Sequence, residues 1–178
     1  MLFRGKGNDQ KKRFDTLIMP HASSAYNLAR WLLGNDSDAE DALQDSLIRA
    51  YRNLDSLRSP NIRAWLFQIV RNTAYTQIRT RKSTMDQSIE DIGDTEANEE
   101  SNPVVLVLQA IDRANLQHAI DSLPVEYREA IVLRELEGLS YREISEVAEI
   151  PIGTVMSRLA RARTRMQHSL KAVELDGA

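Results

Sequence analysis

The sequence contains no cysteine, which excludes disulfide bonds and thiolate metal sites and fits a reducing compartment. Its three histidines, His21, His118 and His168, are far apart in the sequence and share no motif, so we expect no histidine metal site. No signal peptide is visible, and no hydrophobic run approaches membrane-spanning length. We therefore expect a cytoplasmic protein without membrane insertion and without a cofactor.

Glycine and proline are also few, and the alternation of polar and apolar residues that marks strands is absent. The 178 residues allow one or two domains, and a hydrophobic content of 42% is enough to build their cores. The sequence predicts an all-α protein. Nothing in it supports a helical enzyme, since it has no histidine cluster and no glycine-rich phosphate loop.

The formal net charge is only −3, but charge is unevenly spread. Residues 60–83 contain five basic and no acidic residues, whereas residues 85–103 contain seven acidic and no basic residues. The acidic stretch lacks apolar periodicity, which predicts a flexible linker. We expect two small helical domains, 1–84 and 108–173, joined by a linker at 85–107 and followed by a tail at 174–178. Two cationic surfaces on a flexible tether suit bivalent binding to one long polyanion.

The segment "GTVMSRLARARTRM" at 153–166 carries four arginines and no acidic residue. Apolar residues recur at helical spacing from Val155 to Leu170 and predict one buried stripe. A polar face away from this stripe suits phosphates and the acceptor edges of guanine. The candidate DNA-binding residues on it are Thr154, Ser157, Arg158, Arg161 and Arg165.

The preceding segment, "LSYREISEVAEIPIGTV", predicts a short helix opened by a capping box of Ser140 and Glu143. Pro151 then breaks the chain directly before the basic helix. A short helix, a tight break and a second helix with a polar outer face are typical of a helix-turn-helix. An ordinary helical hairpin is the alternative, and the joint pattern favours DNA binding.

The helix predicted in "DSDAEDALQDSLIRAYRNL" has a buried stripe of Ala39, Leu43, Leu47, Ala50 and Leu54. Its opposite face is mostly acidic but has one apolar residue in its middle. A solvated helix face would not need an apolar residue there, whereas a protein partner with basic side chains around a small apolar spot would. The candidate protein-binding residues are Asp41, Gln44, Asp45, Ile48 and Arg52.

The helix predicted in "IRAWLFQIVRNTAYTQIRTRK" has a wide apolar arc, and we interpret Trp65, Phe67 and the more distant Trp31 as core residues. Its remaining strip combines amides, arginines and one aromatic ring. Such a strip suits single-stranded nucleic acid, with charge for the backbone and a ring for stacking. The strip contains Gln68, Arg71, Asn72, Tyr75 and Arg79.

These three segments resemble, in order, the polymerase-binding helix, the −10 promoter helix and the −35 domain of the extracytoplasmic-function (ECF) sigma factors of bacterial RNA polymerase. The resemblance covers about residues 12–170, with the acidic linker in the family's place. Three motifs in order are more specific than a lone helix-turn-helix. A helix-turn-helix regulator that binds duplex operators and a sigma-mimicking adaptor remain as alternatives.

The resemblance implies a transcription initiation factor and not an enzyme. Its partners would be the β′ clamp helices and β flap of core RNA polymerase, promoter DNA and an anti-sigma factor. The helix at 36–54 would dock on the polymerase. The −10 helix and its preceding loop, with Arg58, Asn61 and Ile62, would melt the duplex and hold a flipped base. The basic helix would read the −35 element.

Several positions depart from the family's usual pattern. Met156 stands where arginine or lysine is frequent, and Thr76 replaces a frequent aspartate. Glu149 takes a turn position where glycine is common, at a cost of roughly 1 kcal/mol if φ is positive. Ser145 replaces alanine but remains small. These departures bear on the promoter sequence rather than on the class of protein.

Overall fold

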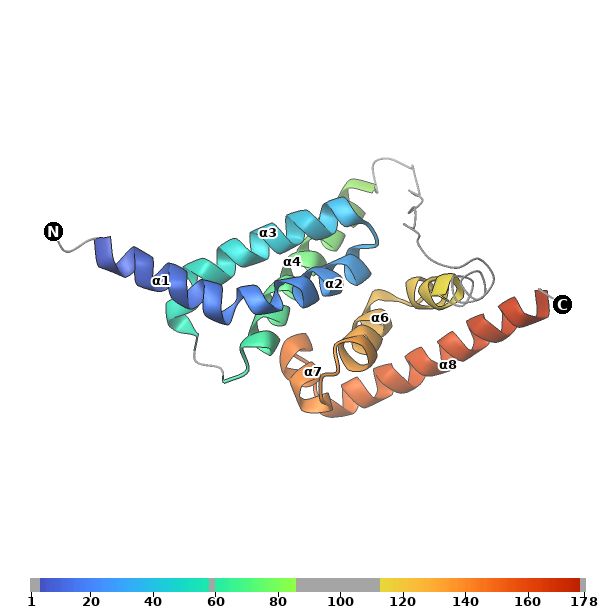
Figure 1. Cartoon of the computed structure of the whole chain (residues 1–178). Coiled ribbons are helices and arrows are strands. Elements are labelled where there is room, and N and C mark those ends of the chain that lie inside the picture. Colours follow the sequence, from blue (N-terminus) through green and yellow to red (C-terminus); the bar gives the residue numbers. More distant parts are fainter. Residues whose placement is uncertain (1–3, 58–59, 86–112, 177–178) are drawn as a thin grey trace, which may run out of the picture.

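A computed structural model describes residues 4–57, 60–85 and 113–176 of the chain (Figure 1). Every regular element in these ranges is a helix, so the all-α prediction is confirmed. Residues 86–107 of the predicted linker and the candidate Arg58 lie outside the described residues. No helix within the described ranges combines the length and hydrophobicity needed to span a membrane.

The described residues of the first half form the helices α1 (Arg4–Leu17), α2 (Ala22–Leu33), α3 (Asp36–Arg52) and α4 (Ile62–Met85). Helices α2, α3 and α4 pack on one another. Leu28, Ala42 and Phe67 are fully buried among them. Phe67 is thus a core residue as predicted, whereas Trp31 and Trp65 are half-buried at the edge of the core.

Short local signals set the ends of these helices. Gly34, with φ of 83°, ends α2 in the left-handed region that glycine adopts without strain. The Asn35 side chain then accepts a hydrogen bond from the Asp38 amide at 2.9 Å and caps α3. In the same way, Asn61 accepts a bond from the Ala64 amide at 3.0 Å at the start of α4. These caps fix the residues at which α3 and α4 begin.

The second half begins with helical residues 113–121 and continues with α6 (Val125–Ile131) and a π-helical turn (Val132–Leu136). Helices α7 (Tyr141–Ala148) and α8 (Ile152–Asp176) follow. The predicted capping box of Ser140 and Glu143 opens α7, and the helix-turn-helix of α7 and α8 is confirmed. Glu149, between these helices, has φ of 55°. The predicted backbone strain at this position is therefore present.

The two halves pack against each other. Helix α4 contacts α7, and α2 contacts α6. Figure 1 shows the first half in blue to green beside the second half in yellow to red, with α1 and the end of α8 at opposite ends of the molecule. The sequence predicted two domains but gave no indication of this contact between them.

Candidate functional site

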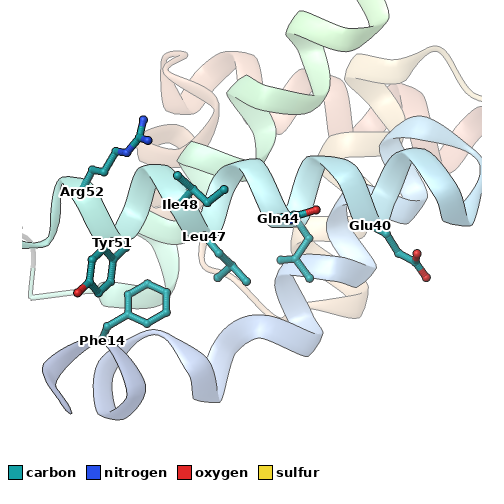
Figure 2. A pocket seen from close by; sticks show the side chains of 8 residues that line it. Phe14, Glu40, Gln44, Leu47, Ile48, Tyr51 and Arg52 are labelled. Atoms are coloured by element: carbon teal, nitrogen blue, oxygen red, sulfur yellow. The ribbon is translucent and has the colours of Figure 1, made fainter. Parts of the chain in front are cut away.

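A groove between α1 and α3 collects part of the predicted protein-binding face (Figure 2). Its volume is about 460 Å³. Gln44, Ile48 and Arg52 line it, and 42% of the Ile48 surface is exposed. Asp41 and Asp45 are exposed on the same helix and do not line the groove. The structure thus places three of the five candidates around one apolar hollow with two carboxylates nearby.

The buried stripe of α3 differs from the prediction. Ala42 and Ser46 are fully buried, whereas Leu43 and Leu47 are only half-buried and line the groove. Ser46 is accommodated in the core because its hydroxyl donates to the Ala42 carbonyl at 2.6 Å. Leu43 and Leu47 pack on the edge of the core and at the same time line the groove. The prediction that both leucines belong to the buried stripe was therefore wrong.

Helix α1 supplies one wall of the groove, which the sequence reasoning missed. The ring of Phe14 meets that of Tyr51 edge-on, with 5.3 Å between centroids. Gln10 donates a hydrogen bond to the Tyr51 carbonyl at 3.0 Å. The available signal was the pair Phe14 and Leu17, which are both half-buried and follow helical spacing on a helix with no other large apolar residue.

The predicted nucleic-acid strip of α4 is largely covered by the second half of the chain. Gln68 donates to a Glu149 carboxylate oxygen at 2.6 Å. Arg71 and Tyr75 are half-buried, whereas Asn72 and Arg79 are exposed. The expectation of one continuous exposed strip was wrong, because acidic residues of α6 and the α7–α8 turn lie over three of its five members.

Glu129 is the centre of this contact. This glutamate is 1% exposed, and its carboxylate has partners from two other helices, α4 and α8. Arg71 donates from Nε to Oε1 at 2.5 Å, and the Tyr75 hydroxyl donates to Oε2 at 3.0 Å. Arg158 of α8 places Nη1 3.7 Å from Oε2. We call these four residues, Glu129, Arg71, Tyr75 and Arg158, the Glu129 cluster.

Burial dominates the electrostatics of the cluster. Desolvation raises the pKa of Glu129, and the charge of Arg71 opposes that shift. Desolvation, together with the charge of Glu129, also raises the pKa of Tyr75. The guanidinium of Arg71 stacks 4.5 Å from the centroid of the Tyr75 ring. The cluster therefore holds a neutral phenol and a buried ion pair between the two halves.

The loop before α4 is tied to the second half as well. The Asn61 amide donates to Glu143 Oε1 at 2.6 Å while its oxygen caps α4. Arg63 pairs with Glu137 and lies 5.0 Å over the ring of Phe67. Ile62 is half-buried. Asn61 of the predicted base-holding loop therefore lies at the contact between the two halves.

The basic face of α8 divides into two parts. Ser157, Arg161 and Arg165 are exposed, as predicted. Thr154 and Arg158 are half-buried, and Arg158 points toward Glu129 rather than outward. The prediction that all five form one outward surface is therefore corrected for these two. Val155, Leu159 and Ala162 are buried and hold the helix on α6, as the stripe predicted.

Within the described residues, no group of three or more histidine, cysteine, aspartate or glutamate side chains could hold a metal ion. The candidate residues of α4 and α8 offer cations, amides and hydroxyls, which suit nucleic acid. The groove on α3 is apolar and suits a protein segment.

Comparison with known proteins identifies this arrangement. Residues 17–84 match the family model "Sigma-70 region 2", and residues 113–166 match "Sigma-70, region 4". The ECF RNA polymerase sigma-E factor of Salmonella typhimurium is 34% identical over 169 residues, covering 90% of this chain and 88% of that protein. The chain belongs to the ECF family of sigma factors.

Two further relatives agree with this assignment. The ECF RNA polymerase sigma factor SigE of Mycolicibacterium smegmatis is 36% identical over 157 residues, and the match spans 61% of its length. The sigma factor RpoE of Bartonella quintana, solved in complex with the anti-sigma factor NepR, has a TM-score of 0.74 and 32% identity. That match covers 90% of this chain and 98% of that one.

The two matched regions correspond to the two halves of the chain. The region 2 match contains α2, α3 and α4, and the region 4 match contains α6, α7 and most of α8. Helix α1 lies almost entirely before the region 2 match, so Phe14 of the groove wall is outside it. The Glu129 cluster joins region 2 to region 4.

Proposed function

We propose that this chain binds core RNA polymerase and directs it to promoters by recognising −35 and −10 elements and melting the DNA. Residues 1–84 act as the polymerase-binding and −10 domain, residues 108–173 act as the −35 domain, and residues 85–107 link them. The chain acts in the cytoplasm and catalyses no reaction of its own.

The helix-turn-helix carries this proposal. Helix α8 follows the turn at Glu149 and presents Ser157 and Arg161 on its exposed side near its N-terminus, the end that enters a major groove in such motifs. Arg165 lies one turn further along and reaches the sugar–phosphate backbone. A guanidinium reads a guanine by two parallel hydrogen bonds. Arg161 is accordingly the base-reading residue.

The groove on α3 supports polymerase binding. Exposed Ile48 lies between Gln44 and Arg52, with Asp41 and Asp45 on the same helix, so a basic helix with an apolar residue at its centre fits there. The β′ clamp helices of the polymerase are the proposed occupant. Region 4 contacts the β flap.

The contact between the halves implies that the factor opens before it melts DNA. Gln68, Arg71 and Tyr75 bond to carboxylates of the second half, so they are not free for the non-template strand in this arrangement. Carboxylates occupy the positions at which DNA phosphates and bases would be bound. Binding to polymerase separates the halves and exposes these three residues, which then form one continuous surface with Asn72 and Arg79.

An anti-sigma factor is the proposed regulator. The Bartonella quintana sigma factor was solved with its anti-sigma factor NepR, and it shares the fold of this chain over nearly its whole length. A comparable partner would stabilise the closed form of this chain and prevent it from binding polymerase.

The test is reconstituted transcription. The full chain is added to core RNA polymerase on a promoter library with randomised −35 and −10 positions, and transcripts are sequenced. We expect enrichment of one spaced pair of elements, with no transcript from core polymerase alone. Binding to duplex DNA without association with core polymerase would contradict the proposal and favour the helix-turn-helix regulator. Association with polymerase without promoter selection would favour the sigma-mimicking adaptor.

A further inference from the structure

Tyr127, on α6, lies beside the two exposed arginines proposed to contact −35 DNA. Arg161 donates from Nη1 to the Tyr127 hydroxyl oxygen at 3.4 Å, and the guanidinium of Arg165 lies 5.3 Å from the centroid of the same ring. A cleft of about 440 Å³ opens between them, lined by Tyr127, Ala160, Arg161, Thr164 and Arg165. One phenol thus contacts two cations that are one helical turn apart.

The other arginines of this helix have different partners. Arg163 pairs with Glu135 at 2.7 Å, and Arg158 lies 3.7 Å from Glu129. Among the described side chains, no carboxylate lies within ion-pair distance of Arg161 or Arg165. The positive charges of these two residues are therefore held in place without being neutralised by an acidic neighbour.

An uncharged residue can position DNA-binding arginines without neutralising their charge. Two arginines at i and i+4 repel each other on an isolated helix, and their long side chains lose conformational entropy on binding. The face of the Tyr127 ring attracts the guanidinium of Arg165, and the hydroxyl accepts one N–H of Arg161. A guanidinium has five N–H donors, so Arg161 retains enough of them to grip a guanine.

We propose that Tyr127 is a positioning residue for −35 recognition. Its hydroxyl orients Arg161 for base reading, and its ring holds Arg165 against the backbone. This inference rests on the proposed −35 function of α8. All three residues belong to α6 and α8, so the arrangement does not depend on whether the two halves of the chain are closed or open.

Two substitutions separate the two roles of the tyrosine. Tyr127→Phe keeps the ring and removes the hydroxyl, and Tyr127→Leu removes both. Tyr141→Phe is the matched control, because Tyr141 is in the same half and its ring stacks with Arg134, which is not among the proposed DNA contacts. Arg161→Ala and Arg165→Ala are the reference variants.

Each full-length variant is combined with core polymerase, and transcription from a library with a randomised −35 element and a fixed −10 element is sequenced. Affinity for the −35 duplex is measured across salt concentrations. We expect Tyr127→Phe to reduce discrimination about fivefold or more at the base that Arg161→Ala affects, with unchanged salt dependence. Tyr127→Leu should also lower the salt slope by about one, as Arg165→Ala does. Tyr141→Phe should change neither.

The positioning role would be overturned if both Tyr127 variants kept the wild-type base preference and salt slope while Arg161→Ala and Arg165→Ala had clear effects. The proposed function of α8 would then still stand. A uniform loss in Tyr127→Leu that tracks a lower thermal midpoint, with no effect of Tyr127→Phe, would also overturn it and make Tyr127 a packing residue. If Arg161→Ala and Arg165→Ala themselves leave −35 selection unchanged, the proposed function of α8 fails.

Discussion

Arg71 of α4 and Glu129 of α6 form an ion pair across the two halves of the chain, with 2.5 Å between Nε and Oε1. The arginine side chain is 15% exposed and the glutamate side chain 2%. Removing one member of a buried pair leaves an uncompensated charge, which is strongly destabilising. The pair therefore favours the closed arrangement while it occupies a residue proposed to bind −10 DNA.

Glu129→Gln should shift the free factor toward an open form. The substitution keeps the shape of the side chain but leaves Arg71 without a buried counter-charge, at a cost of about 1–3 kcal/mol. Because 1.4 kcal/mol is a tenfold change in an equilibrium, we expect the affinity for single-stranded −10 DNA to rise about tenfold. Fluorescence anisotropy with a labelled oligonucleotide gives the measurement.

The control for this prediction is Glu146→Gln, which removes an exposed pair with Arg142 within α7. Such a surface pair contributes little, so no change in DNA affinity is expected. Equal DNA affinity of Glu129→Gln and the wild type would show that the Glu129 cluster does not limit access to α4.

Alkaline pH should open or unfold the protein through Tyr75. The folded pKa of this phenol is raised by burial and by Glu129, whereas the unfolded phenol ionises near pH 10. The stabilisation is therefore complete below about pH 10 and is lost as the pH rises further, because the unfolded chain gives up its proton first. Chemical denaturation between pH 8 and 11 should show a shallower decline for Tyr75→Phe than for the wild type. Parallel declines would remove Tyr75 from this linkage.

Ile48→Glu should weaken binding to core polymerase at least tenfold. The side chain is 42% exposed in the α1–α3 groove, so a charge there disturbs an interface without disturbing the core. Ser37→Glu, at an exposed position of the same helix outside the groove, is the matched control. The thermal midpoint should hold in both variants. Unchanged affinity of Ile48→Glu would exclude the groove from the polymerase interface.

Much of the second half could be predicted from the sequence because its signals are local. The capping box at Ser140 and the positive φ at Glu149 depend on a few neighbouring residues. The exposure of Arg161 and Arg165 followed from helical spacing alone. Each of these features is decided within one or two helical turns.

The contact between the halves could not be predicted in the same way. Glu129 is an isolated acidic residue in sequence, and glutamate is almost never fully buried without a partner. Its partners Arg71 and Tyr75 are more than fifty residues away. Likewise, periodicity predicted that Leu47 is buried, but the residue is half-buried and lines the groove. How far α1 covers that face of α3 depends on tertiary packing, which periodicity does not report.

Met156→Arg should strengthen −35 binding. Met156 is 54% exposed near the start of α8, the end of the helix that is proposed to enter the major groove. One additional phosphate contact should steepen the salt dependence of binding by about one in logarithmic slope. Met156→Gln, of similar size and without charge, is the control. No difference between the arginine and glutamine variants would place Met156 away from the DNA.

One surface of α4 contacts region 4 in the free factor, and we expect the same surface to contact DNA in the holoenzyme. Because the chain lacks cysteine, Ser23→Cys and His168→Cys give unique sites for a donor and an acceptor dye on exposed positions of the two halves. We expect high energy transfer in the free factor, low transfer when core polymerase is added, and intermediate transfer in free Glu129→Gln. An unchanged transfer efficiency in a holoenzyme that transcribes its promoter would contradict the account.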